Sequence, residues 1–281
     1  MWMIVISVTA VIFLLILLGI WQDNDIVVTE TEYKNRKIPA GFEGFRIMQI
    51  SDLHNKSFGR EQRKLLENVR KVSPDIIVVT GDLVDRRRYD LDTAMIFIDG
   101  ALDTAPVFYV PGNHEGWSGR YDEVAARLKS SGVSVLENAS CDIMRSGESI
   151  RVAGLSDPAF LSENHRNEED TSFMIKYIES MPRDGVFTLI LSHRPELFGL
   201  YAEKNLDLVF SGHAHGGQIR LPFIGGLYAP GQGVFPRYTS GIHEEKDSAM
   251  VVSRGLGNSL FPIRFRNRPD IPVVTLHRET V

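Results

Sequence analysis

Apolar and polar residues follow two different periods along the chain. Residues 44–54 and 75–80 are nearly continuous apolar runs, typical of strands that are buried on both faces. Residues 60–72 between them place leucine and valine at helical spacing. Similar patterns predict strands at 26–33, 107–110, 134–136, 150–154, 186–191 and 206–210, and helices at 91–102, 121–130 and 171–179. Strands that alternate with helices predict an α/β domain with a largely parallel core.

The last quarter of the chain has a different pattern. Residues 222–241 are rich in glycine and proline, and the strands predicted at 249–253 and 272–277 have no helix between them. Such a region suits an antiparallel sheet that carries long loops. We therefore expect a sheet-on-sheet core with helices outside it, within one domain.

The amino terminus is the most apolar segment. Residues 1–21 contain no charged side chain, and the first charge is Asp23. At about 1.5 Å per residue, such a helix spans a hydrocarbon core of about 30 Å, with Trp2 and Trp21 near the two interfaces. The alternative is a cleaved signal peptide, but the segment has no basic n-region and its apolar run is long. We predict a transmembrane anchor at 1–22, a linker and first strand at 23–40, and the main domain at 41–281.

The distribution of basic residues bears on orientation. Lys34, Arg36 and Lys37 follow the apolar segment, and no basic residue precedes it. The positive-inside rule then favours a cytoplasmic carboxyl-terminal domain on a single-pass protein of the cell membrane.

Composition excludes several classes of protein. The formal net charge of −5 over 281 residues argues against general nucleic-acid binding, although a local basic patch is compatible with it. Cys141 is the only cysteine, so an intrachain disulfide and a cysteine-cluster metal site are both excluded. The sequence carries no signal for an oligomeric state.

Five predicted strands end in residues that bind metals or transfer protons. These turns are Ser51-Asp-Leu-His54, Gly81-Asp82, Pro111-Gly-Asn-His-Glu115, Ser192-His193 and Ser211-Gly-His-Ala-His215, and they hold five of the 8 histidines. In open α/β sheets, ligands gather beyond the carboxyl ends of the strands. Taken singly, most of these turns are better explained as helix caps, tight turns or a buried histidine, and only the segment Gly212-His-Ala-His215 favours a pair of ligands by itself. Together they predict a metal site at one sheet edge.

The ordered set D-x-H, G-D, G-N-H-E, H and G-H-x-H resembles the calcineurin-like metallophosphoesterase family, from Gly41 to the carboxyl terminus. The turns "LSHRPE" and "GHAHGGQ", the late segment "SRGLGNSLFPIRF" and the apolar amino terminus are most similar to its bacterial membrane-associated branch. The resemblance implies a two-layer β-sandwich flanked by helices, with a dinuclear metal centre at one edge.

The resemblance also implies roles for individual residues. Asp52, His54 and His215 would hold the first metal, Asn113, His193 and His213 the second, and Asp82 would bridge the two. Imidazole combined with carboxylate and amide oxygen suits Mn²⁺, Fe²⁺ or Zn²⁺. A water activated by both metals would attack phosphorus, with Asn113 and His114 contacting the substrate and His114 donating a proton or a hydrogen bond to the leaving group. Gly81, Gly112 and Gly212 would let the backbone turn sharply beside the metals.

The substrate is less well defined by the sequence. Arg86, in the run Arg86-Arg-Arg88, could bind a second phosphate or an anionic head group, and a solvated charged loop is an equal alternative. The segment 221–238 contains Phe223, Ile224, Leu227, Tyr228, Phe235 and Tyr238. This segment could pack an acyl or prenyl chain, or it could simply cover the core.

Three functions are compatible with these features. The first is a membrane-tethered hydrolase of a phosphodiester or pyrophosphate bond in a lipid-linked molecule, such as a nucleotide-activated lipid precursor. The second is a broad-specificity phosphodiesterase or phosphatase whose anchor only sets its location. The third is a metal-stabilised membrane scaffold, which has no need of His114 beside a complete set of ligands.

Overall fold

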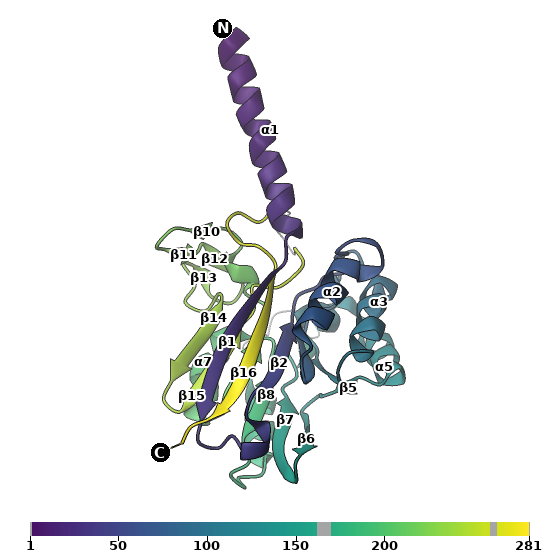
Figure 1. Ribbon diagram of the computed structural model, residues 1–281, viewed down its shortest axis with the longest axis vertical. Coiled ribbons are helices and arrows are strands. Elements are labelled where there is room, and N and C mark those ends of the chain that lie inside the picture. The colour runs from purple at the N-terminus through teal and green to yellow at the C-terminus, as the bar shows by residue number, and fades with distance from the viewer. Residues whose placement is uncertain (1, 162–169, 259–262, 281) are drawn as a thin grey trace.

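Two six-stranded sheets pack face to face in the computed structural model, which describes residues 2–161, 170–258 and 263–280 (Figure 1). In spatial order, the first sheet contains β1 (Val27–Asn35), β16 (Asp270–Arg278), β2 (Phe45–Ile50), β3 (Ile76–Thr80), β4 (Val107–Val110) and β5 (Ser134–Val135). The second contains β14 (Gly241–Glu245), β15 (Ser248–Val252), β9 (Leu208–Ser211), β8 (Thr188–Leu191), β7 (Glu148–Gly154) and β6 (Ala139–Arg145). The predicted sheet-on-sheet core is therefore present.

Apolar side chains from both sheets fill the space between them. Ile47, Val78 and Val110 of the first sheet belong to the same buried cluster as Leu189 and Phe210 of the second. Successive residues of a strand point to opposite faces, so the alternate positions of these strands face outward onto helices. Continuous apolar runs in β3, β8 and β9 follow from this burial on both faces.

Helices cover the two outer faces. The outer face of the first sheet packs against α2 (Arg63–Val72), α3 (Leu91–Leu102) and α5 (Tyr121–Ser131), and that of the second against α6 (Ser172–Ser180) and α7 (Phe198–Glu203). A short helix, α4 (Asn113–Ser118), follows β4 directly. Strands β2, β3, β4 and β5 are parallel to one another, as are β7, β8, β9 and β15. The fold is thus the expected mixed α/β class, with parallel strands in both sheets.

The antiparallel sheet expected near the carboxyl terminus is confirmed only in part. β15 is antiparallel to β14 but parallel to β9. β16 lies in the other sheet, parallel to β1 and antiparallel to β2. The glycine-rich segment instead forms two small antiparallel pairs. These are β10 (Arg220–Leu221) with β11 (Gly225–Gly226), and β12 (Tyr228–Ala229) with β13 (Gly233–Val234). Every residue of β15 is buried, so its sequence has no polar alternation that would reveal which strands flank it.

The amino-terminal segment forms a helix, α1 (Trp2–Asn24), which projects away from the two sheets (Figure 1). Within the residues that the structure describes, no helix combines the length and apolar character needed to cross a membrane. The anchor predicted at 1–22 therefore stays a prediction. The carboxyl end of α1 contacts the domain, since Asp23 Oδ1 accepts a hydrogen bond of 2.8 Å from the main-chain N–H of Arg264.

Candidate metal centre

The five turns singled out in the sequence meet at one edge of the sandwich. They follow β2, β3 and β4 of the first sheet and β8 and β9 of the second. Because these strands are parallel within each sheet, their carboxyl ends lie at the same edge. All seven predicted metal ligands are buried: Asp52, His54, Asp82, Asn113, His193, His213 and His215.

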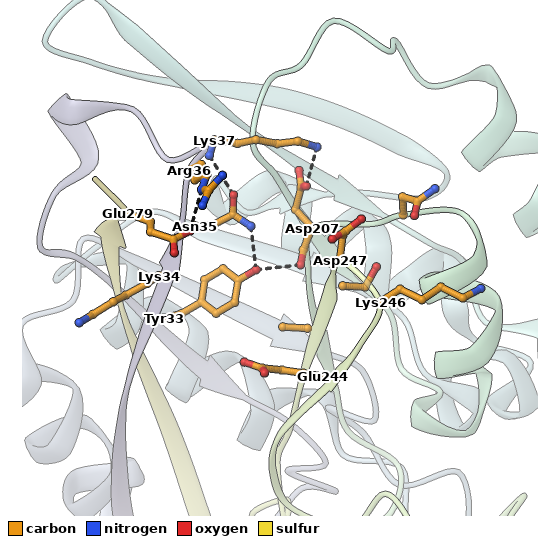
Figure 2. A pocket seen from close by; sticks show the side chains of 13 residues that line it. Tyr33, Lys34, Asn35, Arg36, Lys37, Asp207, Glu244, Lys246, Asp247 and Glu279 are labelled. Atoms are coloured by element: carbon orange, nitrogen blue, oxygen red, sulfur yellow. Dashed lines mark hydrogen bonds and ion pairs between the residues drawn. The ribbon is translucent and has the colours of Figure 1, made fainter. Parts of the chain in front are cut away.

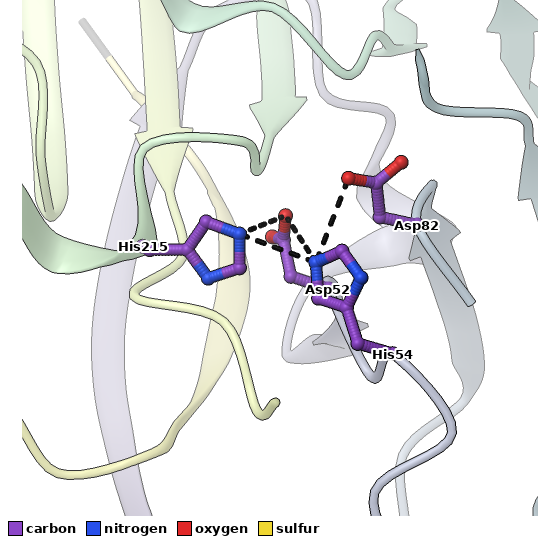
Figure 3. Close-up of side chains that lie close together, drawn as sticks. All are labelled: Asp52, His54, Asp82 and His215. Carbon is purple, nitrogen blue, oxygen red and sulfur yellow. Dashed lines mark hydrogen bonds and ion pairs between the residues drawn. The ribbon is translucent and has the colours of Figure 1, made fainter. Parts of the chain in front are cut away.

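The first group consists of four side chains: Asp52, His54, Asp82 and His215 (Figure 3). His54 Nε2 lies 3.2 Å from His215 Nε2 and 3.6 Å from Asp82 Oδ2. His215 Nε2 lies 3.4 Å from Asp52 Oδ1. One imidazole nitrogen or carboxylate oxygen from each residue therefore points toward a common position.

A second group shares Asp82 with the first. His193 Nε2 lies 3.3 Å from Asp82 Oδ2, 3.0 Å from Asn113 Oδ1 and 3.1 Å from His213 Nδ1. One ligand atom from each of Asp82, His193 and His213 lies within 4.8 Å of the others, close enough to hold a metal ion. The structure therefore brings the seven predicted ligands together in two sets that meet at the Asp82 carboxylate.

The backbone of the site adopts an unusual conformation. Five of these residues have positive φ angles: Asp52 at 52°, His54 at 47°, Asp82 at 51°, His213 at 62° and His215 at 46°. Residues with a side chain seldom adopt left-handed backbone, which costs about 1–3 kcal/mol for each, and such strain clusters at functional sites. The domain holds these turns in a conformation that local preference disfavours.

Two of the glycines are required by close packing beside the ligands. A Cβ atom on Gly212 would overlap Ser51 Oγ and the Asp52 carboxylate, and one on Gly112 would overlap the Asp82 carboxylate. Neither glycine has a positive φ, so the requirement is space and not backbone freedom.

The protonation of the histidines suits metal binding. Burial lowers the pKa of His54 and His213 well below the usual value, and burial together with the nearby Arg264 lowers the pKa of His215 to about 3. These three rings are therefore neutral at pH 7, and a neutral imidazole carries the lone pair that a metal requires.

His193 differs from the other three. Burial alone would lower its pKa, but Asp82 beside it raises the pKa to about 10. The ring also hydrogen-bonds through Nδ1 to the main-chain oxygen of Thr80, at 2.7 Å. This hydrogen bond from Nδ1–H fixes the orientation of the ring and aims Nε2 at Asp82, as in many metal-ligating histidines.

The donor set fits divalent metal ions. The Nε2 atoms of His54 and His215 face each other at 3.2 Å in a buried position, and the Nδ1 atoms of both rings have no hydrogen-bond partner among the described residues. A cation between the two Nε2 atoms would accept both lone pairs. Imidazole, carboxylate and amide oxygen together suit borderline ions such as Mn²⁺, Fe²⁺ or Zn²⁺.

His114 lies beside the two groups. Its ring centre is 4.4 Å from that of His54, and its Nδ1 accepts a hydrogen bond of 3.2 Å from the main-chain N–H of Arg86. The guanidinium of Arg86 lies over the Trp117 ring, 4.4 Å from its centre. Arg86 therefore lies beside the site, as predicted, with its side chain positioned by an aromatic ring.

Glu115 was given no role in the sequence analysis, yet it connects two of the turns. Its Oε2 accepts hydrogen bonds of 2.8 Å from the main-chain N–H groups of Asp82 and Gly112, and its Oε1 accepts one of 3.0 Å from that of Val84. Burial, followed by the charge of Asp82, raises the pKa of Glu115 to about 7. Its place in the motif "GNHE", directly after two site residues, was the available signal.

A buried ion pair, Arg194 with Asp157, was also missed. The guanidinium donates to the two carboxylate oxygens at 2.7 and 2.9 Å, and its Nη1 lies 3.2 Å from His213 Nε2. Asp157 comes soon after β7, which is another parallel strand of the second sheet. The strand-end argument that located the other turns could therefore have found it.

The predicted apolar segment divides into two parts. Phe223, Ile224 and Phe235 are exposed, whereas Tyr238 packs in the core beside α7. Tyr238 therefore covers the core, whereas the packing of an acyl or prenyl chain by the exposed residues stays a prediction. Residues 259–262 of the late motif and His165 lie outside the described residues.

Another cavity, of about 500 Å³, lies at the opposite edge of the sandwich, where β1 ends and β9 begins (Figure 2). Two of its cations are paired, since Lys37 Nζ donates to Asp207 Oδ1 at 2.8 Å and Arg36 lies 3.3 Å from Glu279. The Tyr33 hydroxyl also donates to the main-chain oxygen of Asp207. This cavity contains none of the predicted site residues.

Comparisons with known proteins agree with this geometry. A family model described as calcineurin-like phosphoesterase matches residues 45–217. The metallophosphoesterase YkuE of Bacillus subtilis is 31% identical over 91% of this chain and 87% of its own length. The phosphodiesterase YaeI of Escherichia coli is 26% identical over 83% of this chain and 82% of its own.

A solved structure supports the fold. The phosphopantetheinyl hydrolase PptH of Mycobacterium tuberculosis aligns with a TM-score of 0.50 and 17% identity, over 77% of this chain and 92% of its own. The family model covers most of the chain and includes all five turns of the site. The chain therefore belongs to the calcineurin-like phosphoesterase family and is a metal-dependent phosphohydrolase.

Proposed function

We propose that this protein is a membrane-anchored dimetal phosphoesterase that hydrolyses a phosphodiester or pyrophosphate bond in a lipid-linked substrate. The observation that carries the hydrolytic part is the shared carboxylate, because Asp82 Oδ2 lies 3.6 Å from His54 Nε2 and 3.3 Å from His193 Nε2. A carboxylate between two donor sets offsets the repulsion between two cations held close together.

The proposed ligand assignment follows the two groups. Asp52, His54 and His215 would bind one ion, Asn113, His193 and His213 would bind the other, and Asp82 would contribute to both. Two divalent ions held here would supply Lewis-acid chemistry, which activates water and neutralises charge on the phosphoryl oxygens. The protein positions the donors in advance through the strained turns, so that little reorganisation is needed during the reaction.

His114 is proposed as the donor to the leaving-group oxygen. Its Nδ1 accepts from the Arg86 N–H, so in the neutral ring the proton resides on Nε2. Burial lowers the pKa of His114, which favours this neutral form, although the nearby Asp82 opposes the shift. His114 then stabilises the leaving oxygen through a hydrogen bond from Nε2–H.

Arg86 is proposed to contact a phosphoryl oxygen of the substrate. Its guanidinium lies over Trp117 and its main chain contacts His114, so the cation is held beside the proposed leaving group. A planar guanidinium that stacks on an aromatic ring remains able to donate hydrogen bonds to phosphate.

The membrane part of the proposal rests on exposed apolar surface. Trp2, Met3 and Ile6 on α1 are exposed to at least 65% of their possible area. Phe223 and Phe235 are also exposed, on the loops that carry β10 to β13, which lie at the same end of the molecule as the base of α1 (Figure 1). Apolar side chains gathered at one end of a molecule favour contact with a lipid bilayer.

The hydrolytic proposal is tested with the full chain in detergent. The protein is stripped of metal, and hydrolysis of bis(p-nitrophenyl) phosphate is measured with and without Mn²⁺, Fe²⁺ or Zn²⁺. We expect turnover only with metal. A folded protein that binds these ions and hydrolyses neither this diester nor a lipid diphosphate would contradict it.

The membrane proposal has a separate test. The chain is fused at its carboxyl terminus to green fluorescent protein or to alkaline phosphatase and produced in a bacterium. Retention in carbonate-washed membranes with an active fluorescent reporter would support a cytoplasmic domain. Release from the washed membranes would contradict the anchor, and an active phosphatase reporter would contradict the orientation.

A broad-specificity phosphodiesterase is the second candidate, favoured by the similarity to a relative named phosphodiesterase. The two functions differ in substrate preference. A kcat/KM for a micellar lipid diphosphate that does not exceed the value for bis(p-nitrophenyl) phosphate would favour this second function.

A further inference from the structure

A cavity of about 400 Å³ opens beside the candidate metal centre. Its lining residues are His54, Asn55, Lys56, Arg88, Asp90 and Asn258. His54 is one of the proposed metal ligands, so the cavity adjoins the position where a scissile phosphate would bind. A group attached to that phosphate could therefore extend directly into this space.

The charges around the cavity favour an anion. Lys56 and Arg88 come from different turns, and the side chain of Arg88 is 74% exposed. Among the described lining residues, Asp90 is the one that is acidic, and its carboxylate accepts hydrogen bonds from the main-chain N–H and hydroxyl of Thr93 at the start of α3. The described lining residues therefore carry two cations and one engaged carboxylate. The Arg88 guanidinium also lies 3.7 Å from Asp85 Oδ2, outside the lining, and a bound phosphate would compete with this contact.

The two cationic turns are also connected to each other. The Asn55 side-chain amide donates to the main-chain oxygen of Arg88, and Asn55 directly precedes Lys56. This hydrogen bond fixes the separation of the two turns. Cations held at a fixed separation can bind one phosphate together more strongly than cations on independent loops, because less conformational freedom is lost on binding.

Two of the lining residues, Lys56 and Asn258, also contact the carboxyl-terminal end of α1. Lys56 Nζ donates to the main-chain oxygen of Asp23, and Asn258 Nδ2 donates to the Asp23 carboxylate at 3.3 Å. Asp23 is the penultimate residue of α1. The cavity therefore lies between the candidate metal centre and the end of the helix that we propose as the membrane anchor.

We infer that this cavity binds a second phosphate group of a membrane lipid substrate, held by Lys56 and Arg88 while the scissile phosphate occupies the metal centre. The inference rests on the proposed function and adds a substrate class to it. The preferred substrate is then a lipid whose head group carries two phosphates, and it reaches the site from the bilayer side.

The inference is tested by direct binding to the metal-loaded full chain in detergent micelles, with no free metal. Isothermal titration calorimetry compares alkane diphosphonates of two to five carbons with the monophosphonate of the same length. We expect at least one diphosphonate to bind about tenfold more tightly than its matched monophosphonate, as a second charge-assisted contact would give.

Variants assign that preference to the cavity. In the double variant Lys56→Gln/Arg88→Gln, the ratio of the diphosphonate affinity to the monophosphonate affinity should fall to about twofold or less, because the second phosphonate group loses both cations. Arg87→Gln is the matched control, since Arg87 adjoins Arg88 in the sequence but is absent from the cavity lining, and the ratio should persist. Melting temperature and metal content verify that each variant is folded and loaded.

Lipid and soluble sources of the second phosphate are separated by competition. Diacylglycerol pyrophosphate in the micelles should displace the bound diphosphonate at a concentration about tenfold lower than inorganic pyrophosphate. Equal displacement would overturn the lipid assignment. If no diphosphonate preference is found, or if the preference survives in the double variant, the cavity is not the site of the second phosphate. Failure of the proposed hydrolysis would appear separately, as absent turnover.

Discussion

The main-chain N–H of Arg86 donates a hydrogen bond of 3.2 Å to Nδ1 of His114. A backbone N–H is always a donor, so Nδ1 must be the acceptor and the proton of the neutral ring must reside on Nε2. The turn after β3 thereby sets the tautomer of a residue in the turn after β4. This relationship leads to the first two predictions.

Replacement of His114 by alanine should reduce kcat for bis(p-nitrophenyl) phosphate by about 10²–10⁴-fold, because the leaving oxygen loses its donor. Bound metal should remain near the wild-type content, since His114 is not a proposed ligand. His243→Ala, at a histidine on β14, is the matched control and should leave kcat within about twofold. Loss of metal from His114→Ala would instead place this residue among the ligands.

The pH profile should reflect a neutral His114. Because burial lowers its pKa below the usual value near 6.5, the ring is uncharged from pH 7 upward and its Nε2–H persists. We therefore expect kcat/KM to show no decline between pH 7 and 9. A decline centred near pH 6.5 that disappears in His114→Ala would show that the charged ring is the active form.

Metal affinity at the His193 group should increase with pH. Asp82 raises the pKa of His193 to about 10 against the effect of burial, so in the metal-free protein this ring holds a proton that a metal must displace. The need to displace this proton weakens metal binding at low pH. The metal affinity should therefore increase about tenfold per pH unit between pH 7 and 9. Calorimetry in buffers of different ionisation enthalpy measures the released proton, and an affinity independent of pH would contradict the assignment.

Glu115→Gln should destabilise the metal-free domain by about 1–3 kcal/mol. The two oxygens of Glu115 accept three main-chain hydrogen bonds, and a glutamine must turn its NH₂ group toward at least one of these N–H donors. The free energy of unfolding in urea tests this, with Glu67→Gln on the exposed face of α2 expected to change it by less than about 0.5 kcal/mol. Equal stability of both variants would show that Glu115 does not hold the turns together.

Much of the fold could be predicted from local sequence patterns. Helix α3 was predicted with its observed bounds, because its apolar residues repeat at helical spacing. The structure adds that Asp90 caps its first turn. The pairing of β15 and β16 could not be predicted in this way. Both strands are almost entirely buried, and β9 and β2, with which they pair, lie more than 40 residues away in sequence.

The candidate site was easier to predict than the topology around it. Its seven ligands lie directly after strands that are themselves recognisable, and parallel strands bring their carboxyl ends to one edge without any knowledge of strand order. The supporting residues were harder to predict. Glu115 and Arg194 act through hydrogen bonds to other turns, and only the folded backbone reveals those partners.

The central claim is that Asp82 joins two metal ions into one hydrolytic centre. The most direct measurement is the metal content and bis(p-nitrophenyl) phosphate turnover of the full chain, its Asp82→Asn variant and the control Asp99→Asn, whose side chain is exposed on α3. We predict about two ions per chain and full turnover for the wild type and the control, with at most one ion and at least about a 100-fold loss of turnover in Asp82→Asn. Two bound ions and undiminished turnover in Asp82→Asn would contradict the account.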